Sequence, residues 1–211
     1  MKKLLLFFLG FSSIIFSGCG TGYQKEDGNW VYVSLDGGSW EKQSHLIEDV
    51  DKASFHILWN KDMAKDKNHV YHRWSKMKYA DAGSFENIKG EIYSKDKNSV
   101  FINHLRIENS DPISFEILEF PYSKDKNQVY CGNVPMRVNN IASFKALEKG
   151  IGSTQGSSKS FDRIHPEYAY LDSLLEDGRV FYSIRAYAEA EGQFFEDFRE
   201  IERPDPFNLT K

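Results

Sequence analysis

Three short polar segments carry the side chains that could do chemistry in this sequence. Asp-Lys-Asn occurs at 66–68, 96–98 and 125–127, each time followed by one variable residue, a Val and an aromatic residue. Carboxylate and amide oxygens suit Ca²⁺, but each copy offers few ligands and no distal Glu completes a helix–loop–helix calcium site. Asp and Asn side chains also bond to nearby backbone amides and tolerate left-handed conformations. We therefore interpret six residues as turn-building rather than metal-binding: Asp66, Asn68, Asp96, Asn98, Asp125 and Asn127.

The remaining reactive side chains form no familiar catalytic pattern. His69 and His72 are close in sequence, but no spaced partner completes a zinc set, and on a strand the two would point to opposite faces. The sequence contains no Gly-x-Ser-x-Gly elbow, no phosphate-binding Gly loop and no His-Glu-x-x-His. We expect no catalytic residues, no metal and no cofactor.

Tryptophans are the most suggestive candidates for binding. The chain has sixteen Phe, eleven Tyr and four Trp, and Trp30, Trp40, Trp59 and Trp74 all lie in its N-terminal part. They either pack the first hairpins or line a face that binds a protein or a glycan. Trp59 and Trp74 are the candidates for such a face.

A repeat of about thirty residues must position these side chains. The Asp-Lys-Asn copies begin at intervals of 30 and 29 residues. A second marker, Ser-Phe, advances in phase with them at intervals of 30, 30 and 29, with its aromatic residues at Phe55, Phe85, Phe115 and Phe144. A unit of this size cannot bury its apolar face alone, so stacked neighbours are expected to share a core.

Each unit should begin with a short helical turn. A residue suited to capping a helix precedes each Ser-Phe, namely Asp51, Asp81, Asp111 and Asn140. Three residues after each Phe comes Leu58, Ile88, Leu118 or Leu147. This spacing predicts two apolar anchors on one face of the turn.

The second half of each unit reads as a β-hairpin. A Val and an aromatic residue follow Asp-Lys-Asn, which favours a strand. Gly132-Asn133 has the composition of a two-residue hairpin turn, and a similar turn is expected near Asn103-His104. Pro135 lacks an N–H, which places its strand at an edge or a bulge.

The repeated unit resembles the DKNYY family of bacterial proteins. The resemblance is carried by "DPISFEIL" with "YSKDKNQVY" and by the copies around Asp66 and Asp96, and covers about residues 51–147. It implies an exported or lipid-anchored repeat protein and offers no active site to carry over. We expect a mainly β (α+β) fold in which hairpins and short helical turns form a curved antiparallel sheet or β-solenoid, with a propeller-like ring as the alternative.

Altered copies are expected to cap this array. At the N-terminal side, 27–41 keeps the Asp, Asn, Val and Tyr of the motif. At the other end, a degenerate repeat is expected over 162–202, with 177–182 as a worn Val-aromatic strand and 191–198 as its helical turn. Between them the Gly/Ser-rich segment 150–161 reads as a mobile surface loop. The single repeat domain would span 27–211.

The first eighteen residues read as an export signal. "MKK" is a basic start, the following apolar stretch of thirteen residues is too short for a stable membrane anchor, and "FSGC" ends at Cys19. This ending resembles the lipobox of bacterial lipoproteins, which implies lipid attachment at Cys19, a tether over 19–26, and membrane association through the lipid. Because Gly20 rather than Asp follows, the resemblance implies the outer membrane in a cell with two membranes, with the domain facing the periplasm or the surface.

Charge and cysteine content limit the kinds of binding partner and the covalent links that the sequence allows. Removing Lys2 and Lys3 with the signal changes the formal net charge from −4 to −6, which argues against nucleic acid. Once Cys19 is lipidated only Cys131 remains, so no internal disulfide can form. We expect a lipid-anchored, non-enzymatic module that binds an unidentified protein or is structural. The alternatives are an immunity or inhibitor lipoprotein of the envelope and a glycan-binding or hydrolytic envelope enzyme.

Overall fold

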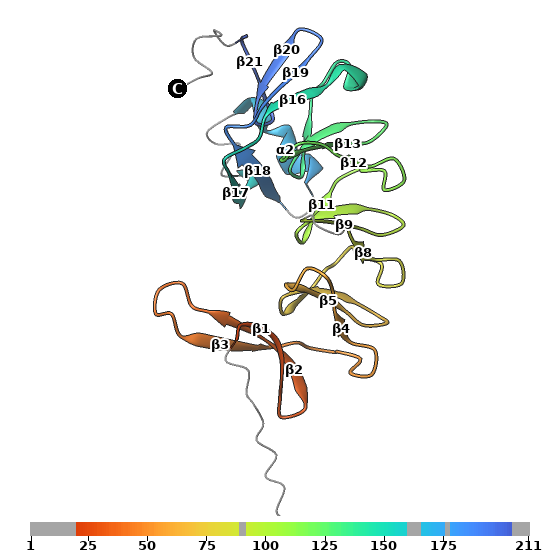
Figure 1. The fold of residues 1–211 in the computed structure, drawn as a ribbon, viewed down its shortest axis with the longest axis vertical. Helices are drawn as coiled ribbons and strands as arrows, with labels where there is room; N and C mark the ends of the chain where they lie inside the picture. The colour runs from red at the N-terminus through yellow and green to blue at the C-terminus, as the bar shows by residue number, and fades with distance from the viewer. Residues whose placement is uncertain (1–19, 89–91, 160–165, 176–177, 204–211) are drawn as a thin grey trace, which may run out of the picture.

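The computed structural model describes residues 20–88, 92–159, 166–175 and 178–203 (Figure 1). Cys19, the signal and most of the last nine residues lie outside this part. The prediction of a mainly β protein is confirmed. The strands are β1 (Gly22–Glu26), β2 (Asn29–Leu35), β3 (Lys42–Leu46), β4 (His56–Ile57), β5 (Met63–Lys65), β6 (Val70–His72), β7 (Ser75–Lys76), β8 (Glu86–Asn87), β9 (Tyr93–Lys95), β10 (Val100–Ile102), β11 (Leu105–Ile107), β12 (Glu116–Ile117), β13 (Tyr122–Lys124), β14 (Val129–Cys131), β15 (Val134–Met136), β16 (Lys145–Glu148), β17 (Gly152–Ser157), β18 (Arg179–Ile184), β19 (Tyr187–Ala190), β20 (Gln193–Glu196) and β21 (Arg199–Ile201). Helical elements are short: the 3₁₀ turns η1 (Ile141–Ser143) and η2 (Pro166–Tyr168) and the helix α2 (Tyr170–Leu174).

These strands form several small antiparallel sheets rather than one large sheet. A three-stranded sheet, β1-β2-β3, is followed by the four-stranded sheets β4-β5-β6-β7, β8-β9-β10-β11 and β12-β13-β14-β15. The last four-stranded sheet has the order β16-β19-β20-β21, because the separate pair β17-β18 is inserted after its first strand. The sheets follow one another along the long axis of the molecule, with β1–β3 at one end and β19–β21 at the other (Figure 1).

Each Asp-Lys-Asn segment is the turn between the second and third strands of its sheet. It joins β5 to β6, β9 to β10 and β13 to β14. The predicted two-residue turns follow at the other end of the third strand. Gly132-Asn133 joins β14 to β15, and Asn103-His104 joins β10 to β11. Pro135 lies on β15, which is an edge strand as predicted.

The predicted helical turns form, but their apolar anchors do not share a face. Asp51 accepts hydrogen bonds from Ser54 N and Oγ at 3.0 and 2.8 Å, and the chain becomes the strand β4 directly after Phe55. Phe55 packs with the cluster around Tyr71, whereas Leu58 packs with the next cluster, around Val70. The expectation was wrong because residues three apart on extended backbone lie on opposite faces.

The core consists of hydrophobic layers between neighbouring sheets. Val70 and Tyr71 are adjacent on β6 and fully buried on opposite faces, so one sheet contributes to two layers. The repeated Phe packs against the aromatic residue of its own unit, with ring centroids 5.7 Å apart for Phe55–Tyr71 and for Phe85–Phe101. Phe115 is only half-buried, 6.5 Å from Tyr130. Sharing of the core between neighbours is thus a feature of the structure.

The C-terminal part differs from its predicted organisation. The segment 150–161, predicted as a mobile loop, contributes β17, which pairs with β18 from Gly152↔Ile184 to Ser157↔Arg179. The segment 177–182 was expected to be a worn repeat strand, but its residues 179–182 lie in this inserted pair. The segment 191–198 was expected to be a helical turn, yet Gln193–Glu196 form β20. Its residues alternate between buried and half-buried, the period of a strand.

Candidate functional site

The Asp-Lys-Asn turn is held together by one buried carboxylate. Asp66 Oδ1 accepts hydrogen bonds from the backbone N–H of Asn68 and His69, both at 2.7 Å. Its Oδ2 accepts from Asp51 N at 2.8 Å and from the Tyr71 hydroxyl at 2.9 Å. The carboxylate therefore ties its own turn to the start of the unit and to the following strand.

The same bonds recur in the other two copies. Asp96 accepts from Asn98, Ser99 and Asp81, and Asp125 accepts from Asn127, Gln128 and Asp111, all backbone N–H groups at 2.7–2.9 Å. The serine of each of the first three Ser-Phe markers accepts the lysine N–H of its unit's tripeptide at 3.0–3.1 Å, in the pairs Ser54–Lys67, Ser84–Lys97 and Ser114–Lys126. The two sequence markers advance in phase because they bond to each other.

Each tripeptide lysine is exposed at its amine and forms an ion pair. Lys67 Nζ lies 2.7 Å from Asp51 Oδ2, with its side chain 64% exposed. The corresponding pairs are Lys97–Asp81 at 3.0 Å and Lys126–Asp111 at 2.8 Å. Bonding to these lysines lowers the pKa of Asp51 and of Asp111 to about 2. Burial acts to raise the pKa of Asp66, but the hydrogen bonds from Asp51, Asn68 and His69 lower it overall.

These carboxylates serve separate turns and do not converge on one site. Asp66, Asp96 and Asp125 each belong to a different sheet, and their oxygens are occupied by hydrogen bonds from the chain. Across the described ranges no three His, Cys, Asp or Glu side chains are grouped in a way that could hold a metal ion. The Asn68, Asn98 and Asn127 side chains are exposed. The hydrogen bonds of the three aspartates therefore account for the repeated tripeptide as a turn that the fold needs.

The opposite end of the sheets carries the predicted tryptophans. Trp74 lies in the two-residue turn between β6 and β7, and Trp59 lies in the connection between β4 and β5. Both segments are at the same end of this sheet, since Arg73 N donates to Asp62 O at 2.7 Å. Trp59 and Trp74 are 53% and 39% exposed, and no ring contact joins them within the described chain. The structure thus brings the two residues to one end without placing them together.

Two stacked ring pairs extend the surface around Trp74. His45 of β3 stacks on Trp74 with centroids 4.0 Å apart and an interplanar angle of 17°. His72 stacks on His104 of the next sheet at 4.5 Å and 16°. The ring pairs bridge the first sheet to the second and the second to the third. Sequence reasoning missed them, because the partners are about thirty residues apart and fall in different positions of the repeat.

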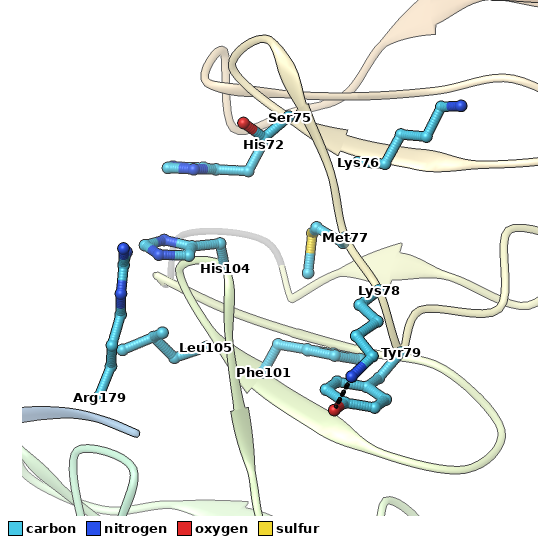
Figure 2. A pocket seen from close by; sticks show the side chains of 10 residues that line it. All are labelled: His72, Ser75, Lys76, Met77, Lys78, Tyr79, Phe101, His104, Leu105 and Arg179. Atoms are coloured by element: carbon cyan, nitrogen blue, oxygen red, sulfur yellow. Dashed lines mark hydrogen bonds between the residues drawn. The ribbon is translucent and has the colours of Figure 1, made fainter. Parts of the chain in front are cut away.

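A pocket of about 310 Å³ opens at the second of these pairs (Figure 2). It is lined by His72, Ser75, Lys76, Met77, Lys78, Tyr79, Phe101, His104, Leu105 and Arg179. In Figure 2 Arg179, at the start of β18, lies beside His104, whereas Lys76 points away from the two rings. The lining includes no carboxylate. Burial is the largest cause that lowers the pKa of His72 to about 4, and the neighbouring charges of His104 and Arg73 act in the same direction.

The third turn of this row is covered by the chain itself. Asn133 N donates to Phe181 O at 3.0 Å, Phe181 N donates to Asn133 Oδ1 at 2.7 Å, and Asn133 Nδ2 donates to Arg179 O at 2.9 Å. Gly132 permits this approach, because a Cβ there would lie 1.8 Å from the Phe181 carbonyl oxygen. Asn103 and Arg73 hold the same turn position with side chains and positive φ of 51° and 56°. The first two turns therefore stay uncovered by β18.

Comparison with known protein families identifies the repeat. The DKNYY family matches the chain twice, over residues 3–105 and 93–209. The chain belongs to the DKNYY family. The two DKNYY matches together extend well beyond 51–147, the range in which the motif is clear by eye, and they take in the atypical terminal sheets.

Other comparisons add no relative. No curated protein and no solved structure matches the chain. Among the residues that the structure describes, no helix is both long and apolar enough to cross a bilayer. The DKNYY repeat is thus the one relationship on which a functional argument can build.

Proposed function

We propose that this DKNYY protein is a lipid-anchored component of the bacterial cell envelope whose repeat domain binds another protein and catalyses no reaction. The anchoring half of the proposal is supported by the sequence "FSGC" after an apolar stretch of thirteen residues. One acyl chain gives only marginal membrane binding, and several chains on one cysteine give a durable anchor. The mature protein would begin at Cys19 and sit on the outer membrane.

The stacked sheets are proposed to act as an open, curved array of the β-solenoid type. In Figure 1 the first sheet, β1–β3, and the last strands, β19–β21, lie at opposite ends of the molecule, which supports an open array over a closed ring. Such arrays present long surfaces made of equivalent positions from successive units. The two-residue turns at Trp74 and His104 form a surface of this kind, whereas β18 covers the equivalent turn at Asn133.

The observation that carries the binding proposal is the exposure of large apolar side chains at the N-terminal sheets. Trp40 is 75% exposed at the β2–β3 turn, where Leu35 is also exposed. Leu46 is exposed at the far end of β3, and Trp59 and Trp74 follow on the next sheet. Tryptophan dominates protein–protein contacts because it buries much surface at little cost in side-chain entropy. More than half of the surface of Trp40 and of Trp59 is exposed, and contact with a partner is the proposed reason for this exposure.

A role as an immunity or inhibitor lipoprotein is a special case of this proposal, in which the bound protein is a toxin. The pocket beside Trp74 favours a second class, a glycan-binding or hydrolytic envelope enzyme, since it holds His72 and His104. Glycoside hydrolysis uses a pair of carboxylates, and the pocket lining has none. Binding is therefore the function that the described geometry supports best.

The anchor is tested by membrane fractionation of Cys19→Ser. Without the acceptor thiol we expect the protein to leave the membrane fraction. Cys131→Ser is the matched control, because Cys131 lies buried in β14 and should not affect anchoring. A Cys19→Ser variant that still sediments with membranes refutes the anchor.

The binding face is tested by photo-crosslinking in intact cells. A benzoylphenylalanine at position 74 should give a discrete crosslinked protein, and the same probe at position 67, in the opposite turn, should not. Lys67 is the matched control because its side chain is exposed, more so than Trp74, and it lies at the other end of the same strands. Equal crosslinking from both positions, or none from position 74 or 59, refutes a partner at this face.

A further inference from the structure

The pocket between the second and third sheets has an unbalanced charge. Arg179 is exposed at the start of β18, and among the described residues no carboxylate pairs with its guanidinium. His72 and His104 present stacked imidazoles next to it (Figure 2). Lys78 adds a second cation to the rim, where its amine donates to the Tyr79 hydroxyl at 2.7 Å. Positive and hydrogen-bond-donating groups therefore meet in a pocket whose described lining holds no acid, in a protein whose net charge is negative.

Burial and nearby positive charges both oppose protonation of the His72 ring. The pKa of His72 falls to about 4, first because the ring is buried and then because His104 and Arg73 oppose a further positive charge. Asp62 acts in the other direction and does not compensate. No hydrogen bond from the described chain engages the His72 ring, so a ring nitrogen can serve a ligand.

We propose that this pocket binds a tetrahedral oxyanion, as phosphate or as the phosphate of an ester, held by Arg179, His104 and His72. A guanidinium presents several N–H donors in a fixed plane and suits phosphate oxygens. The two imidazoles supply donors from a second direction, which matches an anion with more than two free oxygens. A pocket of about 310 Å³ has room for the anion together with a small organic group.

The fold explains why the pocket occurs at this unit. At Gly132-Asn133 the backbone of β18 fills the space over the turn, and Asn133 satisfies its N–H and C=O groups. At the preceding turn, Asn103-His104, the first residue of β18 contributes to the pocket lining, and the Arg179 side chain lies beside His104 (Figure 2). The inserted pair β17-β18 thus closes one turn and contributes the key cation to the next. This site is independent of whether the surrounding face binds a protein.

The direct test is a titration of the full-length protein in detergent micelles, followed by the carbon-bound proton resonances of its histidine rings. Inorganic phosphate should shift the His72 and His104 resonances saturably, whereas chloride at equal ionic strength should not. Acetate, a planar oxyanion, should bind more weakly. A second arm uses sn-glycerol 3-phosphate, the phosphorylated part of a lipid headgroup. Tighter binding than phosphate assigns the site to a headgroup, and equal binding assigns it to the free anion.

Variants decide whether the named residues hold the anion. Arg179→Gln should weaken phosphate binding by about tenfold or more, as expected for loss of a charged hydrogen bond. His104→Gln should weaken it as well and guards against a folding defect in the first variant. Lys149→Gln is the control, because Lys149 is an exposed cation paired with Glu119 outside the pocket. Histidine shifts that chloride reproduces, or phosphate affinity unchanged in Arg179→Gln, overturn the proposal.

Discussion

The two ends of the stacked sheets follow different rules. At one end, three copies of Asp-Lys-Asn make the same hydrogen bonds to the same backbone groups. At the other end, the two-residue turns share a backbone conformation but differ in every side chain, from Arg73-Trp74 to Asn103-His104 to Gly132-Asn133. The end with the Asp-Lys-Asn turns, called the uniform end below, builds the fold. The end with the two-residue turns, called the variable end below, carries the exposed tryptophans and the histidine pocket.

This contrast reverses a natural reading of the sequence. Repeated carboxylates attract attention as possible ligands, yet their oxygens are used up by backbone amides. The turns at the other end look unremarkable in sequence, and the unusual chemistry lies there. Repetition in this protein marks what the fold requires, and departures from the repeat mark candidate function.

The largest change in stability is expected from the buried Phe of the Ser-Phe marker, which lies at the uniform end. Phe85 is 2% exposed and packs on Phe101. Phe85→Ala should lower the free energy of unfolding by about 3–5 kcal/mol, because it removes transfer energy and leaves a cavity. Urea denaturation followed by circular dichroism measures this. Phe115→Ala is the internal comparison and should cost less, since Phe115 is half-buried; equal losses would contradict the layer arrangement.

Acid should weaken the uniform end in a defined pH window. The pKa of Asp51 and of Asp111 is about 2 in the folded protein against an ordinary value of 3.8. A carboxyl whose pKa is lowered by folding contributes stability above its unfolded pKa, and this contribution disappears as pH falls through the folded value. Stability should therefore decline from about pH 4 to pH 2. Asp51→Asn should flatten the decline in a thermal-denaturation series, and an unchanged slope would contradict the ion-pair account.

As the pH falls, the variable end should begin to lose stability at a higher pH than the uniform end. The folded pKa of His72 is about 4, below its ordinary 6.5, so the unfolded chain binds the proton first. Stability should fall as pH drops from about 6.5 to about 4, the window above that of the aspartates. His72→Gln should remove this upper step and leave the lower one intact. Loss of both steps, or of neither, would show that the two ends do not titrate separately.

The smallest effect is expected from the tyrosine hydroxyl in the uniform end. Tyr71 and Tyr130 donate to the turn aspartate of their unit, whereas the second copy has Phe101 at this position. Tyr71→Phe should cost about 1 kcal/mol of unfolding free energy, the typical value of one hydrogen bond. Chemical denaturation of this variant beside Phe101→Tyr, which should not destabilise by more than this amount, measures the difference. A cost of several kcal/mol would mean that the hydroxyl does more than close the turn.

Local patterns in the sequence predict much of the uniform end. Residue types and their spacing are enough to predict several features of the sheets. These are the turns at Asp66, Asp96 and Asp125, the capping residues, the Gly132-Asn133 turn and the edge position of Pro135. The opposite facing of Phe55 and Leu58 does not, because the choice between helical turn and strand after Phe55 depends on pairing with β5. Sequence periodicity indicates neighbours along the chain but not how the backbone rotates between them.

The contacts of the variable end could not be predicted from the sequence and became visible only in the structure. The pairing of His72 with His104 joins different positions of consecutive units, and Arg179 enters from an insertion more than seventy residues later. The Gly/Ser-rich composition of 150–161 suggested a loop, yet pairing with the β-branched and aromatic residues of β18 makes it a strand. Long-range pairing of this kind overrides local composition.

The measurement that tests the central contrast most directly compares the two ends of one sheet. Asp96→Ala and His104→Ala alter residues on either side of β10, at the uniform and the variable end. The account predicts that Asp96→Ala lowers the urea-derived free energy of unfolding by about 2–4 kcal/mol, because three backbone N–H groups lose their acceptor. It predicts a change of less than about 1 kcal/mol for His104→Ala. Equal losses of unfolding free energy, or an Asp96→Ala protein as stable as the parent, would contradict the division of the fold into a uniform end that builds it and a variable end that binds.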